Sequence, residues 1–153
     1  MTFKTTPMKY NQLKLENQLC FPVYAASRLI IREYQPYLDK LGITYPQYLA
    51  LMILWEEDGM PVNDIAKKLI LNTNTITPLL KRMEKQGLVE RERSKQDERK
   101  IIIKLSKQGF DLQEKAKSIP EDLSKKLLNS SLEINDLIHL KENLEDIISL
   151  LGK

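Results

Sequence analysis

Two short helices, a tight connection and two alternating strands follow one another between residues 62 and 105, and this order constrains the fold more than any other feature. The first helix covers residues 62–69. The second ends at Gly87, a residue that suits the position just after a helix C-terminus. Only residues 70–73 separate the two. Two short helices joined by so tight a turn predict a helix-turn-helix.

The second of these helices has one apolar and one polar side. Ile76, Leu79, Leu80 and Met83 form the apolar stripe. At about 100° per residue, the remaining positions gather on the opposite side and its flanks. They are polar or basic with one proline: Asn74, Thr75, Thr77, Pro78, Lys81, Arg82 and Lys85. A helix that enters the major groove of DNA has such an outer face.

A β-hairpin is expected directly after this helix. Residues 88–93 and 99–105 flank a short charged loop, and the second run alternates, with Ile101 and Ile103 on one face and Ile102 on the other. A hairpin behind a helix-turn-helix is a wing. The fold class expected is therefore mainly α with a small β-hairpin wing, a winged helix-turn-helix.

Helices are also expected on the N-terminal side of this region. Residues 21–41 have the apolar spacing of a long helix, with Pro22 in its first turn and Pro36 kinking or ending it. Thr44 and Gln47 form a capping box that starts the next helix.

The C-terminal third is predicted to be helical as well. Ser106 caps a helix that runs to about Leu128 with a bend at Pro120, and Ser130 with Glu133 forms a capping box for the last helix. That helix carries a long apolar stripe, namely Ile134, Leu137, Ile138, Leu144, Ile147, Ile148 and Leu151. So small a chain cannot cover this stripe alone, which predicts a partner subunit.

Three regions of one intertwined domain follow from this pattern. Residues 1–43 form an N-terminal arm and a dimerisation and sensor helix, residues 44–107 form the DNA-binding region, and residues 108–153 form the C-terminal dimerisation helices. The expected assembly is a homodimer that reads a palindromic operator in double-stranded DNA.

Composition excludes several classes of protein. One cysteine and one histidine exclude an internal disulfide and make a zinc site or a Ser-His-Asp triad improbable, so no metal, cofactor or enzymatic activity is expected. No apolar run reaches the roughly 20 residues of a membrane span and no signal core is present, so we expect a soluble, cytoplasmic protein.

The charge is distributed unevenly. Residues 62–107 contain 12 Lys and Arg against 6 Asp and Glu, a net charge of +6, whereas the whole chain carries 24 against 21 and the rest is therefore −3. Concentrated positive charge around a helix-turn-helix points to a polyanion such as DNA.

Several segments resemble the OhrR subgroup of the MarR family of bacterial regulators. They are Leu15–Phe21 with Tyr24, Leu38–Leu41, Ile43–Leu51, Thr77–Glu84 and Asp97–Arg99. The likeness covers roughly residues 13–119. Pro22 and the run Asn72-Thr73-Asn74 depart from the subgroup, which usually has an apolar non-proline residue and Asp-Ser-Gly there.

This resemblance implies a repressor that senses organic hydroperoxides through one reactive cysteine, which would be Cys20. It implies that Tyr24 and Tyr34 hydrogen-bond the sulfur, with Tyr45 as a weaker third candidate. Tyr34 lies fourteen residues beyond Cys20, about 21 Å along a straight helix, so only a partner subunit's antiparallel helix could bring a Tyr34 to it. At a helix N-terminus the dipole would stabilise the thiolate that peroxides oxidise.

The DNA contacts follow from the same pattern. Asn74, Thr75 and Thr77 lie toward the N-terminal end of the recognition helix and are expected at base edges, whereas Lys81 and Arg82 are expected on phosphates. The resemblance places the wing residue Arg99, beside Asp97, in the minor groove. The alternative for Arg99 is a structural salt bridge to Asp97, and both can hold.

The oxidised cysteine has several fates. Without a second cysteine, the sulfenic acid would condense with a low-molecular-weight thiol, form a sulfenamide or over-oxidise.

Other functions stay open at this point. A MarR-type repressor released by a small aromatic ligand is the main alternative. A thiol peroxidase is disfavoured because no resolving cysteine is present, and a scaffold without DNA contact is disfavoured by the basic segment. A lone cysteine is also often no more than a small hydrophobe.

Overall fold

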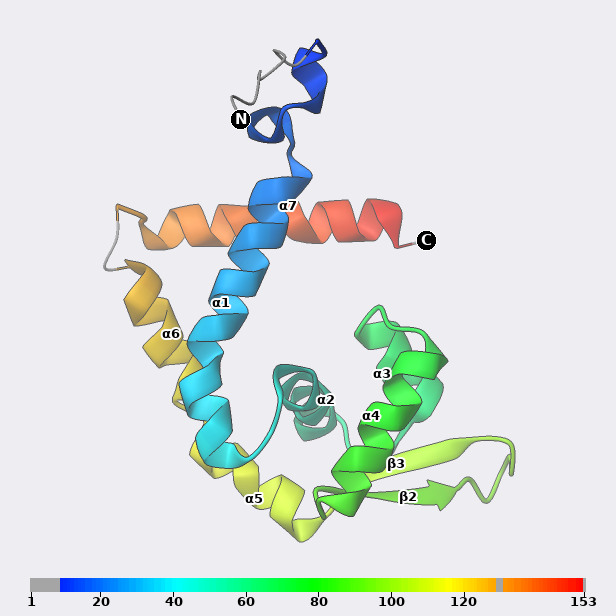
Figure 1. Ribbon diagram of the computed structural model, residues 1–153. Coiled ribbons are helices and arrows are strands. Elements are labelled where there is room, and N and C mark those ends of the chain that lie inside the picture. Colours follow the sequence, from blue (N-terminus) through cyan, green and yellow to red (C-terminus); the bar gives the residue numbers. More distant parts are fainter. Residues whose placement is uncertain (1–8, 129–130, 153) are drawn as a thin grey trace, which may run out of the picture.

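The computed structural model describes residues 9–128 and 131–152. Two 3-10 turns, Asn11–Leu13 and Leu15–Asn17, precede a series of helices and three short strands. In chain order these are α1 (Cys20–Leu41), α2 (Tyr45–Glu56), β1 (Met60–Pro61), α3 (Val62–Lys68), α4 (Thr73–Lys85), β2 (Val89–Arg93), β3 (Ile101–Leu105), α5 (Lys107–Ala116), α6 (Ile119–Leu128) and α7 (Ile134–Leu151). Figure 1 shows α2 in the middle, between α1 and the α3–α4 pair.

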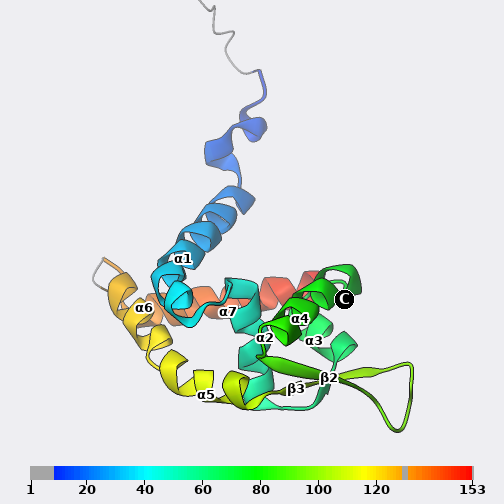
Figure 2. The ribbon, with the colours of Figure 1, turned by 60° about the horizontal axis from the view of Figure 1, so that its bottom comes forward.

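The predicted winged helix-turn-helix is confirmed. Helices α3 and α4 form the helix-turn-helix, and β2 and β3 pair antiparallel with Val89 opposite Leu105 and Arg93 opposite Ile101. The strand β1 was not predicted, because two residues are too few to show an alternating pattern. It pairs with β3, so the sheet has the order β1-β3-β2. In Figure 2 the loop after β2 extends away from the helices as the wing.

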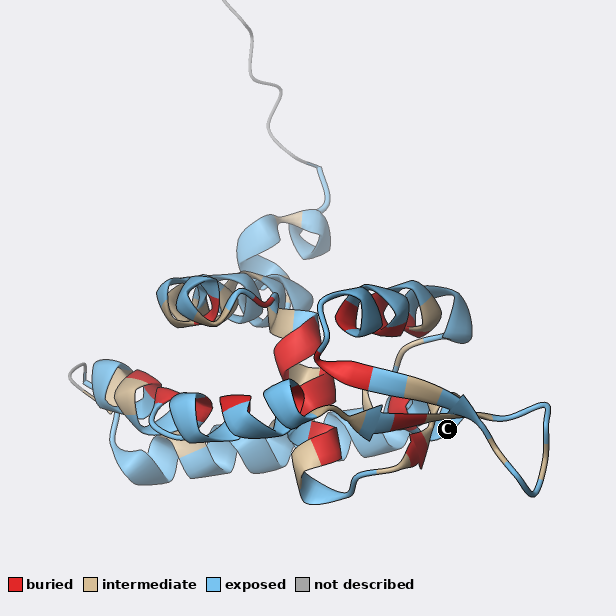
Figure 3. Cartoon of the chain, turned by 90° about the horizontal axis from the view of Figure 1, so that it is seen from below, coloured by how far each residue is buried: buried red, intermediate tan, exposed pale blue. Residues whose placement is uncertain are grey.

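The core surrounds α2 and the inner faces of α3 and α4. Figure 3 shows the buried residues gathered in the middle of the molecule. The stripe predicted on α4 is fully inside: Ile76, Leu79, Leu80 and Met83 are 0–5% exposed. The Thr44–Gln47 capping box is also present, with the Thr44 backbone N–H donating to Gln47 Oε1 at 2.9 Å.

The long helix predicted over residues 21–41 is present as α1. Pro36 lies inside α1, which continues to Leu41 and closes with Gly42 in the left-handed conformation at φ 69°. Of the two outcomes expected at Pro36, a kink or an end, the end does not occur. Packing of the last turn explains this, since Leu38 is completely buried and offsets the one backbone hydrogen bond that proline removes.

Two further predictions on the C-terminal side need correction. The helix expected from Ser106 to Leu128 is divided into α5 and α6, and Pro120 lies in the first turn of α6, where its missing N–H costs nothing. The cap of α7 is Glu133 with Asp136 rather than Ser130 with Glu133, and Glu133 N donates to Asp136 Oδ2 at 2.8 Å. A carboxylate caps a helix N-terminus as well as a hydroxyl does. Ser130 lies outside the described residues.

Helix α7 has no buried residue, although its apolar stripe was predicted correctly. Ile138 is 46% exposed and Ile148 50%. The N-terminal half of α1 is similarly uncovered, and Figure 2 shows it projecting away from the helix-turn-helix. Among the described residues, no helix is long and apolar enough to cross a membrane.

Candidate DNA interface and redox centre

The recognition helix α4 starts with a side-chain cap from Asn72. Asn72 Oδ1 accepts hydrogen bonds from the backbone N–H and the hydroxyl of Thr75, each at 3.0 Å. Because these bonds satisfy a free N–H of the first turn, asparagine serves here as aspartate would. The Thr75 hydroxyl, predicted to read bases, therefore also takes part in the cap.

The outer face of α4 is accessible. Asn74, Lys81 and Arg82 are exposed, whereas Thr77 is half-buried. Pro78 lies inside the helix and has no N–H to give to the carbonyl of Asn74.

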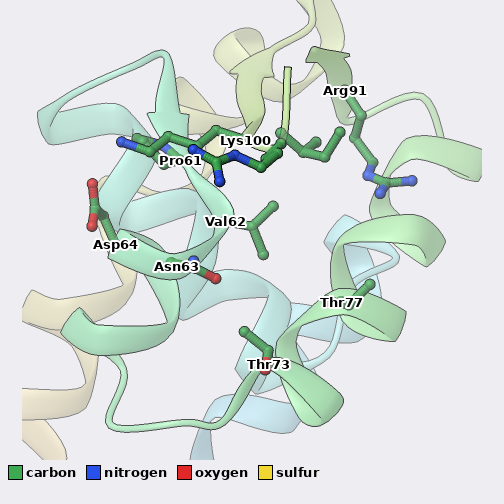
Figure 4. Close-up of a pocket in the computed structure, with 10 residues that line it drawn as sticks. Pro61, Val62, Asn63, Asp64, Thr73, Thr77, Arg91 and Lys100 are labelled. Atoms are coloured by element: carbon green, nitrogen blue, oxygen red, sulfur yellow. The ribbon is translucent and has the colours of Figure 1, made fainter. Parts of the chain in front are cut away.

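A cavity of about 260 Å³ lies between the wing and the first turns of α3 and α4. Figure 4 shows Thr73 and Thr77 on α4, with Arg91 on β2 and Lys100 before β3 also lining the space. Arg99 lines it too. The three cationic groups around this hollow all come from the wing, whereas α4 contributes two threonines and α3 contributes Asp64.

Arg91 ties the wing to the recognition helix. Its Nη1 lies 3.4 Å from Glu84 Oε2 of α4, and its Nε is buried without a hydrogen-bond partner among the described residues. Sequence reasoning missed this residue, whose only signal was its inward position on an alternating strand.

The tip of the wing exposes Arg99. Its side chain is 92% exposed, and its Nε and backbone N–H both lie 3.2 Å from Asp97 Oδ1. The predicted salt bridge between Asp97 and Arg99 is therefore present. It leaves the rest of the guanidinium facing solvent.

Cys20 is the first residue of α1 and is exposed. Tyr24 lies one turn further and is 58% exposed, and its hydroxyl accepts a hydrogen bond from Arg28 Nη1 at 2.9 Å. The described residues hold no group of three acidic, histidine or cysteine side chains placed to bind a metal.

Tyr34 belongs to an aromatic cluster at the other end of α1. Its ring centroid lies 5.0 Å from that of Tyr45 and 5.9 Å from that of Tyr48, and Tyr48 lies 6.1 Å from Trp55. Tyr45 was predicted as a site residue, but Tyr48 was missed, although it follows Tyr45 by three residues on the same helix.

The phenols of this cluster are held in their protonated form. Burial raises the pKa of Tyr34 to about 12, and the neighbouring Tyr45 and Tyr48 add to the shift. Burial also raises the pKa of Tyr45 and Tyr48. At neutral pH these hydroxyls are therefore hydrogen-bond donors.

The four residues predicted to form the sensor lie in two groups within one chain. Cys20 and Tyr24 lie at the exposed start of α1, whereas Tyr34 and Tyr45 lie at its packed end. Because α1 runs without a break from Cys20 to Leu41, Tyr34 is about 21 Å along the axis from its own Cys20.

Known proteins resemble this chain over most of its length. The family model for the transcriptional regulators SarA and Rot matches residues 32–119. The organic hydroperoxide resistance transcriptional regulator of Bacillus subtilis is 54% identical over 112 residues, which cover 73% of this chain and 76% of the relative.

Solved structures agree with this relationship. Reduced AbfR bound to DNA is 40% identical, with a TM-score of 0.74 over 95% of this chain and 100% of that one; AbfR comes from Staphylococcus epidermidis. Disulfide-formed AbfR is 41% identical, with a TM-score of 0.63 over 93% of this chain and 95% of that one. With its winged helix-turn-helix and these relatives, the chain belongs to the MarR-type family of DNA-binding transcriptional regulators, in the OhrR-type branch.

Proposed function

We propose that this chain is a dimeric repressor that leaves its operator when an organic hydroperoxide oxidises Cys20. The observation that carries the proposal is the position of Cys20. It is an exposed thiol at the N-terminus of a 22-residue helix whose first half leaves apolar side chains such as Val23 and Leu29 exposed. The name of the Bacillus subtilis relative supports the same oxidant class.

The dimer would be formed by the two regions that the monomer leaves open. Exposed apolar side chains on α1 include Phe21, Val23 and Leu29, and α7 exposes an apolar stripe along its length. Burying these surfaces against a second copy would remove them from water. The regions proposed from the sequence, residues 1–43 and 108–153, supply both surfaces, and residues 44–107 supply the DNA-binding region.

The redox site would be completed between subunits. In an antiparallel arrangement of two α1 helices, the partner's Tyr34 would donate to the Cys20 thiolate, and Tyr24 of the same chain would lie one turn away. The phenol of Tyr34 is protonated at neutral pH, as any tyrosine is, and burial moves its pKa further from that range, so it can donate. Tyr45 would act indirectly, through its contact with Tyr34.

The chemistry at Cys20 would take two steps, oxidation by the hydroperoxide and then condensation with a thiol. The thiolate sulfur attacks the terminal oxygen of the hydroperoxide and the O–O bond breaks, so the OH group stays on sulfur as a sulfenic acid. The alkoxide that leaves takes a proton from water and becomes the alcohol. A low-molecular-weight thiol then condenses with the sulfenic acid and releases water, leaving a mixed disulfide on Cys20. The bulky adduct would disturb the α1 interface, and with it the spacing of the two recognition helices.

On DNA, the two copies of α4 would lie in successive major grooves. Asn74, Thr75 and Thr77 would face base edges, and Lys81 and Arg82 would contact phosphates. Arg99, oriented by Asp97, would enter the flanking minor groove.

A gel-shift titration with the wild type and Cys20→Ser tests the proposal. Cumene hydroperoxide with a small thiol should release the wild type from its operator and leave Cys20→Ser bound, and mass spectrometry should find the thiol adduct on Cys20. Release of the Cys20→Ser protein, or a Cys20 that stays unmodified, would contradict the sensor function.

A repressor released by a small aromatic acid is the second candidate. The cavity between α4 and the wing favours it, since Arg91 and Lys100 could pair with a carboxylate there. Release of DNA by salicylate in the absence of peroxide, lost in Arg91→Ala, would support this function instead.

A further inference from the structure

One buried polar side chain lies between the sensor helix and the recognition helix. Gln47, in the first turn of α2, is only 3% exposed and is the single polar residue in the buried set of the described chain. Its amide Nε2 donates to Gln86 Oε1 at 2.6 Å, across 39 residues of sequence. Gln86 is the C-terminal cap residue of α4.

The direction of these hydrogen bonds is fixed by the backbone. The N–H of Thr44 is a donor and bonds Gln47 Oε1, so Gln47 must turn its Nε2 toward Gln86. Gln86 must then accept through Oε1, and its own Nε2 faces the carbonyl oxygen of Gly42 at 3.5 Å. In this series of hydrogen bonds, the one between Gln47 and Gln86 is short and strong, whereas the contact between Gln86 and Gly42 is long.

The same helical turn that holds Gln47 also contacts the sensor residue Tyr34. Tyr45 and Tyr48 flank Gln47 in sequence, and both of their rings pack against Tyr34 of α1. The first turn of α2 thus contacts α1 through its tyrosines and α4 through its glutamine. Figure 1 shows α2 placed between those two helices.

We propose that the Gln47–Gln86 hydrogen bond couples the sensor helix α1 to the recognition helix α4, so that a movement of α1 also moves α4. Gln47 and Gln86 are positioning residues, which would touch neither DNA nor the reactive sulfur. A shift of Tyr34 would move the first turn of α2, and the half-buried hydrogen bond would carry that movement to the C-terminus of α4. Without the bond, α4 would follow a movement of α1 less closely, through the shared hydrophobic core alone.

This inference rests on the redox function proposed above, so its test compares each protein with and without oxidation. The quantity measured is the ratio of the operator Kd of the thiol-modified protein to that of the reduced protein. In Gln86→Leu this ratio should fall by about fivefold, the factor expected for one net hydrogen bond. Thiol modification of Cys20, followed by mass spectrometry, should proceed as in the wild type.

Two further variants separate the bond from the size of the side chain. Gln86→Glu keeps an oxygen that accepts from Gln47 Nε2, so it should retain the wild-type ratio. Gln113→Leu makes the same replacement at an exposed glutamine of α5 and should also retain it. A melting temperature for each variant shows whether it is folded.

The outcomes distinguish the two proposals. If the Kd ratio is large in the wild type and equally large in Gln86→Leu, the hydrogen bond does not couple the two helices, while the redox function stands. A Gln86→Glu ratio as low as that of Gln86→Leu would also overturn this coupling. A Kd ratio near one in the wild type would contradict the redox function itself, and with it the coupling through Gln47 and Gln86.

Discussion

At the scale of single residues, the strongest expectation concerns Arg99. Its guanidinium is almost entirely exposed and is held from one side only, by Asp97 Oδ1. Such an arrangement contributes little to folding, because surface ion pairs are weak. It does fix the direction of a cation at the tip of the wing, which suits a narrow minor groove with its strong negative potential.

Arg99→Ala should therefore weaken operator binding by about ten- to hundredfold without lowering the melting temperature. A salt-matched gel-shift titration measures the first quantity and circular dichroism the second. Lys95→Ala, which removes an exposed charge from the same loop, is the matched control and should cost much less. If Arg99→Ala and Lys95→Ala lost operator affinity equally, Arg99 would contribute only its charge and no specific contact in the minor groove.

Tyr34 gives a prediction of pH dependence. Its pKa is raised from 10.0 to about 12 in the folded chain, so between these values the folded state binds more protons than the unfolded state. Stability is then fully present below pH 10 and falls as the pH rises toward 12. Urea unfolding at about pH 8 and about pH 11 should show this fall, and Tyr34→Phe should show a smaller one. If the wild type and Tyr34→Phe lost the same free energy of unfolding between these two pH values, the raised pKa would not belong to Tyr34.

At the scale of elements, the start of α4 depends on one side chain. Asn72 Oδ1 holds both the N–H and the hydroxyl of Thr75, so the cap and a predicted base-reading residue are linked. Asn72→Ala should lower the free energy of unfolding by about 1 kcal/mol, and Asn72→Asp should restore most of it. Urea denaturation measures both, and an unchanged Asn72→Ala protein would show that the cap is unimportant.

The predictions from sequence succeeded where a pattern is local. The stripe of α4, the alternation of β3 and the Thr44–Gln47 box each need only neighbouring residues, and each is present. What the sequence left open or missed depends on tertiary contacts. A kink and an end were both possible at Pro36, and the packing of Leu38 accompanies the continuation of α1 beyond it. Only β3 makes a strand of the two-residue β1.

The functional residues divide in the same way. Cys20 and Tyr34 were chosen from a sequence motif, and the unbroken α1 confirms the spacing that separates them. The bond between Gln47 and Gln86 joins positions 39 residues apart, and no periodicity marks it. Gln47 was already assigned to a capping box, and one amide can serve both purposes because its oxygen and nitrogen face different partners.

At the scale of the whole molecule, one chain buries the core of its DNA-binding region but leaves much of α1 and α7 exposed. The buried residues gather around α2, while α7 and the first half of α1 remain uncovered (Figure 3). A second copy would cover these helices and supply the missing donor to each Cys20. Dimerisation would then serve both operator spacing and redox sensing.

Mixed dimers test whether Cys20 and Tyr34 act across the interface. When a Cys20→Ser chain pairs with a Tyr34→Phe chain, the one remaining Cys20 faces the partner's Tyr34, so its modification by peroxide and thiol should match the wild type. When a wild-type chain pairs with the double variant Cys20→Ser/Tyr34→Phe, the remaining Cys20 faces a substituted position 34. Its modification should slow by about tenfold, the loss expected for one hydrogen bond to a charged sulfur.

Both mixtures contain the same substitutions and one reactive sulfur per dimer, so only the connection between the subunits differs. Two affinity tags isolate each mixed dimer, and mass spectrometry follows the adduct on Cys20 with time. If the tyrosine acted within its own chain, the order would reverse, because Cys20 and Tyr34 are then intact together only in the wild-type chain of the second mixture. The ranking of the two rates therefore decides between a sensor built within one chain and one built between two.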